Sequence, residues 1–294
     1  MPNPVELSLK QRTAVRSFGL LKNYPQFMRR KDACAFQPND YPHCARMGSP
    51  GYEARFHGQM GVKMQIHGFQ KTTLLDFPGH VAATVFTGGC NFLCPFCQNG
   101  DLVLRSAFLP SIPEEGVIRI LEKRKGVLTG VCVTGGEPTL QPDLPFFLEK
   151  LKTLGYLVKL DTNGYRPETL RALHSKGLLD YIAMDIKSSP VHYAKAAGFK
   201  DLDMAPIRES ALFLQTCGLP HEFRTTAVRG LHEPEDFRLI GQWLKGSDPY
   251  FLQSYVHSEG VISPGFDAFN KDELESFLCI LRTYLPNANL RGVE

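Results

Sequence analysis

Short apolar runs alternate with amphipathic stretches from about residue 64 to the end of the chain. Apolar and β-branched residues predict six buried strands, over residues 81–87, 130–134, 156–160, 181–185, 222–228 and 250–254. Apolar residues that recur every three or four positions predict helices over residues 144–154, 167–176, 206–217, 234–245 and 271–285. A further helix is expected from Ser111 to Gly126, because Ser111 and Glu114 have the spacing of a capping box.

The spacing of these elements predicts an α/β fold. Strand centres lie roughly 25 to 45 residues apart, which is typical of right-handed crossovers between parallel strands. Repeated units of this kind give a parallel sheet that is either open or curled into a partial barrel, with the helices outside. In both arrangements ligands bind at the carboxyl ends of the strands. The loops that follow each strand are therefore where functional residues are expected.

Residues 1–63 differ in composition from the rest of the chain. They carry scattered prolines and no sustained apolar period, so they can bury little surface. They hold ten Lys and Arg against four Asp and Glu, whereas residues 64–294 hold 23 against 26. The sequence therefore predicts a poorly ordered or appended extension over residues 1–63 and one folded domain over residues 64–294.

Composition excludes several classes of protein. Hydrophobic residues make up 43% and charged residues 21% of the 294 residues, which is ordinary globular usage. No apolar run reaches the roughly 18 residues of a membrane-spanning helix, and the start of the chain lacks the features of a secretory signal. The mildly acidic body lacks the basic face of a nucleic-acid binder. We therefore expect a cytoplasmic protein with neither membrane nor nucleic acid as a partner.

Three of the eight cysteines form a cluster after the first predicted strand. Cys90, Cys94 and Cys97 have the spacing C-x3-C-x2-C, with which one loop can bring three thiolates to a metal centre. A zinc site would need a fourth ligand, and the nine histidines form no suitable pair. A [4Fe–4S] cluster held by three thiolates instead leaves one iron open to another ligand. The ligand count favours this cluster over zinc or a structural role.

Further candidate residues follow the next strands. Residues 134–138 read Thr-Gly-Gly-Glu-Pro, and glycine lets backbone carbonyls approach a cation closely. Asp161 and Asp185 lie at the ends of the third and fourth predicted strands, so two carboxylates are expected side by side. Such a pair needs a cation or a shared proton. Arg224 lies within the fifth predicted strand and either faces this pocket or sits at an edge.

The cysteine loop resembles the cluster motif of the radical S-adenosylmethionine (SAM) enzymes, including the aromatic Phe96 before the last cysteine. This resemblance implies a partial (β/α)6 barrel of parallel strands with outer helices. It also implies a [4Fe–4S] cluster whose open iron chelates SAM and whose electron cleaves SAM to a 5′-deoxyadenosyl radical. Residues 134–138 resemble the second motif of the family, which implies that Gly135, Gly136 and Glu137 hold the SAM ammonium group. Phe96 is expected to help position SAM.

Residues 161–164 and 184–187 resemble motifs of the glycyl-radical-enzyme activases, a subgroup of that family. The resemblance implies a monovalent cation that touches the SAM carboxylate and is bound by Asp161, Thr162, Asp185 and the carbonyl of Ala183. Lys187 is expected nearby. Residues 71–79 and 222–253 resemble the longer activating proteins of anaerobic ribonucleoside-triphosphate reductases.

The sequence therefore predicts an iron–sulfur activase. It would abstract hydrogen from a backbone glycine of a partner glycyl radical enzyme, with anaerobic ribonucleotide reductase as the favoured partner. A flavodoxin or a ferredoxin-type protein is expected as the electron donor. Two alternatives stay open: a radical SAM enzyme that modifies a peptide or small molecule, and a non-catalytic zinc-binding or redox-sensing module.

Overall fold

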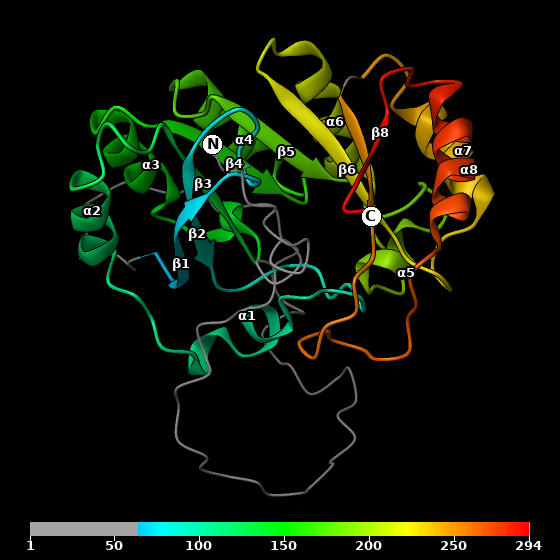
Figure 1. Ribbon diagram of the computed structural model, residues 1–294, viewed down its shortest axis with the longest axis horizontal. Coiled ribbons are helices and arrows are strands. Elements are labelled where there is room, and N and C mark those ends of the chain that lie inside the picture. The colour runs from blue at the N-terminus through cyan, green and yellow to red at the C-terminus, as the bar shows by residue number, and fades with distance from the viewer. Residues whose placement is uncertain (1–63, 248, 294) are drawn as a thin grey trace, which may run out of the picture. The chain divides into compact units, whose positions relative to one another are not determined.

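The computed structural model describes residues 64–247 and 249–293, shown in colour in Figure 1. The extension predicted over residues 1–63 lies outside the described residues. The first strand of the described residues starts at Ile66, two residues after Met64. No helix in the described part of the chain is both long enough and apolar enough to cross a membrane.

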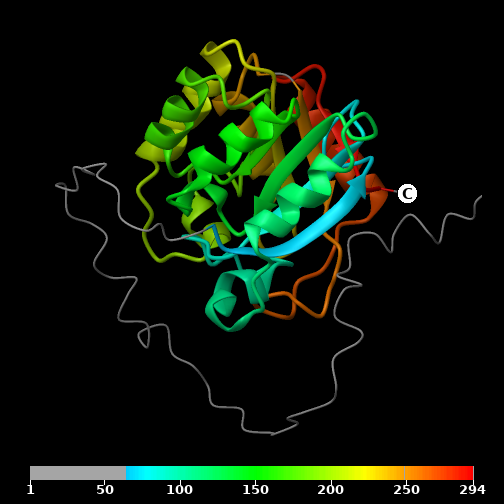
Figure 2. The same ribbon diagram turned by 90° about the vertical axis from the view of Figure 1, so that its left-hand side faces the viewer.

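A single eight-stranded sheet forms the centre of the fold, with its strands side by side in chain order. Strand β1 runs antiparallel to β2, and every following neighbour pair is parallel. The strands are β1 (Ile66–Thr73), β2 (Ala82–Thr87), β3 (Gly130–Gly135), β4 (Leu157–Thr162), β5 (Tyr181–Asp185), β6 (His221–Ala227), β7 (Tyr250–Ser254) and β8 (Asn289–Arg291). The curved arrangement in Figures 1 and 2, with helices outside the sheet, is the partial barrel that the sequence predicts.

The helices connect the parallel strands and cover the outer side of the sheet. In Figure 1, α2 and α3 flank the first strands, while α7 and α8 pack together beside β8. The longer helices are α2 (Glu114–Glu122), α3 (Leu144–Thr153), α4 (Pro167–Ser175), α6 (Ala205–Thr216), α7 (Pro234–Trp243) and α8 (Lys271–Arg282). Two short helices, α1 (Gly100–Leu104) and α5 (Tyr193–Ala197), and two 3-10 turns, η4 (Ser106–Phe108) and η5 (Pro138–Leu140), lie in the connecting loops.

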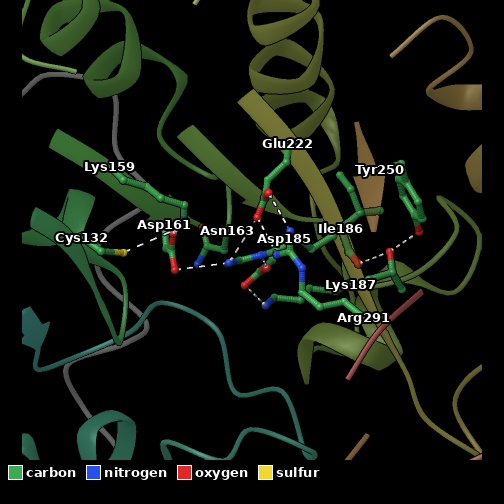
Figure 3. Close-up of polar contacts among 12 residues, drawn as sticks. Cys132, Lys159, Asp161, Asn163, Asp185, Ile186, Lys187, Glu222, Tyr250 and Arg291 are labelled. Atoms are coloured by element: carbon green, nitrogen blue, oxygen red, sulfur yellow. Dashed lines mark hydrogen bonds and ion pairs between the residues drawn. The ribbon is translucent and has the colours of Figure 1, made fainter. Parts of the chain in front are cut away.

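Residues of the parallel strands alternate between the two sides of the sheet. On β4, Val158 and Leu160 are fully buried members of the hydrophobic core. Lys159 and Asp161 alternate with them and point to the inner side, where the charged residues of Figure 3 gather. The outer side therefore provides the hydrophobic core under the helices, and the inner side is free to carry polar chemistry.

All six predicted strands are present, and each boundary agrees within one or two residues. Two further strands, β1 and β8, were not predicted from the apolar pattern. The capping box predicted at Ser111 is wrong, because Pro113 is the N-cap of α2 and its side chain cannot accept a hydrogen bond. A capping box does form at the start of α8, where the backbone N–H of Glu273 donates to Asn270 Oδ1 over 2.9 Å.

Candidate active site

The cysteine loop follows β2 at the carboxyl end of the sheet. Its last turn closes where the Cys97 N–H donates to the Cys94 carbonyl over 2.9 Å. The Phe92 N–H donates to Cys90 Sγ over 3.3 Å, a contact that stabilises a thiolate. Phe96 is 8% exposed and belongs to the hydrophobic core. Phe92 and Phe96 thus anchor the loop in the core, and Cys94 lies between them in the sequence.

Cys94 is buried and Cys90 and Cys97 are half-buried, and burial has the largest effect on the pKa of all three thiols. Burial raises the pKa of Cys90 and of Cys94 to about 12, and it also raises the pKa of Cys97. The positive charge of Lys187 acts in the opposite direction on all three thiols. Buried thiols of this kind become thiolates when a metal centre supplies positive charge.

A segment that follows β7 hydrogen-bonds to the cysteine loop. Figures 1 and 2 show this orange segment passing next to α1. The N–H of Ser263 donates to the Pro95 carbonyl over 2.8 Å, and that of Ile262 donates to the Cys97 carbonyl over 3.3 Å. Gly100 in turn donates to the Gly260 carbonyl over 3.1 Å. These bonds are between backbone groups, so no side-chain pattern in the sequence could have revealed them.

The loop after β3 packs directly against the cysteine loop through glycine. A Cβ atom on Gly136 would lie 1.9 Å from the carbonyl oxygen of Gly89, so only glycine fits there. The Glu137 N–H donates to that same oxygen over 2.8 Å. Gly135 has a φ of 117°, a conformation that favours glycine, and its carbonyl accepts from Asn99 Nδ2 over 3.0 Å. The cysteine loop and the Gly-Gly-Glu loop, the two predicted motifs, therefore pack directly against each other.

The carboxylate of Glu137 is buried and bonded entirely within the protein. Its Oε1 accepts from the hydroxyls of Thr139 and Thr162 over 2.5 and 2.8 Å, and from the Thr139 N–H over 3.1 Å. Its Oε2 accepts from the Asn163 N–H over 2.7 Å. Burial raises the pKa of Glu137 while these bonds lower it. The side chains of Glu137 and Thr162 thus join the loops after β3 and β4.

Charged side chains meet on the inner side of β4, β5 and β6. Arg224 lies between the two predicted aspartates: its Nη1 is 3.3 Å from Asp161 Oδ2, and its Nε is 2.8 Å from Asp185 Oδ1. Lys187 Nζ is 3.1 Å from Asp185 Oδ2, and Lys159 pairs with Asp161. Figure 3 shows the labelled side chains of this group, Lys159, Asp161, Asp185 and Lys187, on the same side of the sheet. Arg224 therefore faces the interior and not an edge.

The pKa values in this group follow from its charge pairs. Burial alone would raise the pKa of Asp161 and of Asp185, but neighbouring cations outweigh it and lower both. Arg224 has the largest lowering effect on each aspartate. Burial likewise opposes the charge of Lys187, yet Asp185 raises the pKa of that lysine above its ordinary value. All of these groups are charged at neutral pH.

The charged group extends to residues that the sequence reasoning missed. Glu222 is 0% exposed, and both its carboxylate oxygens accept from Arg291 on β8, over 2.9 and 3.0 Å. Tyr181 donates to Glu222 over 3.1 Å. Lys159 was overlooked as well, although a lysine two residues before Asp161 in a buried strand shares its side of the sheet. Nothing in the sequence pairs Glu222 with Arg291, because β8 was not predicted.

A family model described as the Radical SAM superfamily matches residues 84–240. The chain belongs to the radical SAM superfamily. The match runs from β2 to α7 and so includes the cysteine loop, the loop after β3 and the charged group apart from Arg291. Membership implies an enzyme with a [4Fe–4S] cluster and SAM, and it leaves no support for the non-catalytic alternative.

The donor set is consistent with such a cluster. Three cysteine sulfurs come from one loop, a backbone N–H points at Cys90 Sγ, and Lys187 lies where its charge acts on all three thiols. Within the described residues, no three Cys, His, Asp or Glu side chains already form a metal-ligand set. The three cysteines are therefore candidate ligands because of their spacing in the sequence, and not because of their side-chain geometry.

Relatives of this radical SAM protein differ in their named activities. A protein of Methanocaldococcus jannaschii, named provisionally as a glycyl-radical enzyme activating enzyme, is 29% identical over 244 residues. The alignment covers 79% of this chain and 98% of that protein. A 7-carboxy-7-deazaguanine synthase of Thermococcus kodakarensis is 32% identical over 185 residues, which cover 56% of this chain and 70% of that protein.

A solved structure supports the fold alone. Streptococcus suis SuiB bound to S-adenosylmethionine superposes with a TM-score of 0.55 at 16% sequence identity. The superposition covers 70% of this chain and 48% of SuiB, so the chain spans about half the length of that protein.

Proposed function

We propose that this protein is a glycyl-radical-enzyme activase whose partner is an anaerobic ribonucleotide reductase. The observation that carries the proposal is the alignment with the M. jannaschii protein, which covers 98% of a chain named as an activating enzyme. The segments over residues 71–79 and 222–253 that resemble ribonucleotide reductase activating proteins support the choice of partner.

In this proposal the cysteine loop holds the cluster, and the loop after β3, with Gly135 and Gly136, shapes the SAM site. Cys90, Cys94 and Cys97 provide the thiolates. When bound, the cluster supplies the electron that cleaves SAM and so generates the radical that takes hydrogen from substrate. Phe96 fixes the loop in the core, and the backbone of Gly135 and Gly136 lets SAM approach closely, because no side chain intervenes.

The residues after β4 and β5 complete the proposed SAM site. Glu137 and Thr162 hold the loops after β3 and β4 together over a hydrogen bond of 2.8 Å. Asp161, Asp185 and Lys187 provide charges on the inner side of the sheet, where the SAM amino and carboxylate groups would be oriented. A flavodoxin or ferredoxin-type protein would supply the electron to the cluster.

A backbone glycine suits the reaction for a geometric reason. Its Cα–H must come within about 3 to 3.5 Å of the deoxyadenosyl carbon for transfer. A glycine has no side chain to obstruct this approach, and an extended loop of a partner protein can present one. The remaining step is hydrogen transfer from that Cα, which leaves the radical on the partner.

The test combines the reduced, iron–sulfur-loaded protein with SAM and the host's anaerobic ribonucleotide reductase without oxygen. We expect 5′-deoxyadenosine to form and the doublet of a glycyl radical to appear in the electron paramagnetic resonance spectrum. A reductase whose radical-bearing glycine is replaced by alanine serves as the control and should give no doublet. SAM cleavage without a doublet, with this and other glycyl radical enzymes of the host, would overturn the activase proposal.

A second candidate is a radical SAM enzyme that acts on a small molecule. The observation that favours it is the T. kodakarensis synthase, which is more identical to this chain, at 32%, than the longer activase match. This candidate predicts that a small-molecule fraction of the host accelerates SAM cleavage in the absence of any protein partner. The two candidates are separated by comparing that fraction with the purified reductase.

A further inference from the structure

The side chains that the family resemblance assigns to a monovalent cation are already engaged within the protein. Strand register places Asp161 beside Ala183 and Asp185 beside Arg224. Arg224 contacts Asp161 over 3.3 Å and Asp185 over 2.8 Å. The third side chain, the Thr162 hydroxyl, donates to Glu137 over 2.8 Å, and its oxygen accepts from the Gly164 N–H over 3.1 Å, so its hydrogen bonds are made within the protein. These residues do not fit a free monovalent cation.

The charge balance leads to the same conclusion. Three carboxylates in this group, on Asp161, Asp185 and Glu222, are matched by four cationic side chains, on Lys159, Lys187, Arg224 and Arg291. Each of these carboxylates therefore already has a cationic partner within the protein. A further cation would compete with these partners for the same carboxylate oxygens.

Burial explains why one of these cations must be fixed. The Arg224 side chain is 12% exposed, that of Asp161 is 14% exposed and that of Asp185 is 33% exposed. Two carboxylates held side by side at this depth repel each other unless a positive charge lies between them. The guanidinium is planar, is charged at every physiological pH and donates in several directions, so it can bridge both aspartates at once.

We infer that Arg224 is a built-in cation that takes the place of a soluble monovalent ion. It is a positioning residue that holds Asp161 and Asp185 in the arrangement required by the SAM site, and SAM binding therefore does not depend on Na⁺ or K⁺. The inference rests on the SAM site proposed above and is independent of the identity of the glycine-bearing partner.

The first arm of the test uses the unaltered, full-length protein loaded with its cluster. SAM affinity and the Tm are measured in choline chloride, sodium chloride and potassium chloride at equal ionic strength, because ionic strength alone changes charge interactions. We expect the same affinity and the same Tm in all three salts. Weaker SAM binding in choline chloride, restored by Na⁺ or K⁺, would overturn the inference without any variant.

The second arm uses Arg224→Gln, which removes the charge but keeps a polar side chain. We expect SAM affinity to become dependent on the cation, with a change of between about 5- and 150-fold from choline to potassium chloride. Millimolar guanidinium chloride should also restore binding. Arg238→Gln is the matched control, because Arg238 lies on the surface paired with Glu235 and should behave like the unaltered protein.

Two readouts separate this inference from the proposed SAM site. The Tm of Arg224→Gln should rise with K⁺ or guanidinium relative to choline even before SAM is added. A protein that fails to bind SAM in every salt would contradict the proposed site, while this Tm comparison would still decide the role of Arg224. An Arg224→Gln protein with full SAM affinity and a cation-independent Tm would overturn the inference. Should that variant not fold, the salt series on the unaltered protein decides.

Discussion

The two halves of the candidate site are held together by different kinds of contact. On the side of β2 and β3, backbone groups and glycines make the contacts: the Gly89 carbonyl accepts from the Glu137 N–H over 2.8 Å, and a Cβ on Gly136 would lie 1.9 Å from it. On the side of β4 to β6, charged side chains make them, with Arg224 between two aspartates. The first, which we call the backbone half, needs positions without a side chain. The second, the charged half, needs a partner of opposite charge for each buried charge.

The difference predicts how each half fails. Two backbone segments in close contact leave no space for a side chain, so an added atom forces the backbone to shift. A group of charges loses most when one partner is removed and the other stays buried, and less when both are removed. In the backbone half, any larger side chain should therefore lower stability. In the charged half, the stability losses of single substitutions should be strongly non-additive.

The largest effect is expected from the cluster ligands. Cys94→Ala should abolish the brown colour of the anaerobically loaded protein and all SAM cleavage, because two thiolates cannot hold the cluster in place. Cys90→Ala and Cys97→Ala should behave alike. Absorbance, iron content and 5′-deoxyadenosine formation measure this. Cys279→Ala is the control, because Cys279 is exposed and should leave all three unchanged. Normal activity in any of the three ligand variants would refute their assignment.

Gly136→Ala tests the backbone half directly. The new methyl group would collide with the Gly89 carbonyl, and we expect a loss of about 3 kcal/mol in the free energy of unfolding, the upper range for overpacking. This corresponds to a fall in Tm of roughly 6 to 12 °C. Gly116→Ala is the matched control: Gly116 lies in α2 with no atom near its added Cβ, so the substitution should stabilise slightly. Equal Tm values for both variants would contradict the close-contact argument.

Glu222→Gln tests the charged half. It leaves the Arg291 guanidinium without its carboxylate partner, and we expect unfolding to become easier by about 3 kcal/mol. Combining it with Arg291→Gln should cost clearly less than the sum of the two single changes, as chemical denaturation of the four proteins would show. Strictly additive losses would mean that the pair is not coupled. Glu235→Gln, on the surface, should leave stability unchanged.

A smaller, pH-dependent effect is expected where the charged half is anchored. His232 is 3% exposed, its Nε2 lies 2.8 Å from the Lys187 carbonyl, and the Val228 N–H donates to its Nδ1. Burial lowers the pKa of His232, so the folded protein keeps this histidine neutral. Below about pH 6.5, the unfolded chain takes up a proton that the folded one does not, and stability falls by up to about 1.4 kcal/mol per pH unit.

The Tm measured between pH 7.5 and 5.5 checks the role of His232. The unaltered protein should lose stability as the pH falls, and His232→Gln should start lower but change less with pH. A variant with the same pH dependence as the unaltered protein would show that another group titrates.

The smallest effect is expected from the removal of residues 1–63. A chain that begins at Met64 should fold and cleave SAM as well as the full chain, because residues 1–63 have no sustained apolar pattern. Tm and the rate of SAM cleavage measure this. A large fall in either would mean that residues 1–63 contribute to the folded domain.

Sequence reasoning located the backbone half well. Cysteine spacing and the Gly-Gly-Glu run are local signals, and the strand pattern correctly placed them at the carboxyl ends of β2 and β3. It also placed Asp161 and Asp185 on adjacent strands, as the register confirms. It missed β1 and β8: β8 has only three residues, and most of β1 shows no clear alternation of buried and exposed positions.

By itself the sequence determined the fold class and the positions of the glycines at the strand ends, because these follow from periodicity and the shape of single residues. It also predicts the ligands of the proposed cluster from the spacing of the cysteines. Only the tertiary structure decided what lies between the two aspartates. Arg224 is 63 residues from Asp161 and 39 from Asp185, and the three meet because the parallel strands align in register. The physical reason is that the electrostatic interaction between two side chains depends on their distance in space, and not on their separation along the chain.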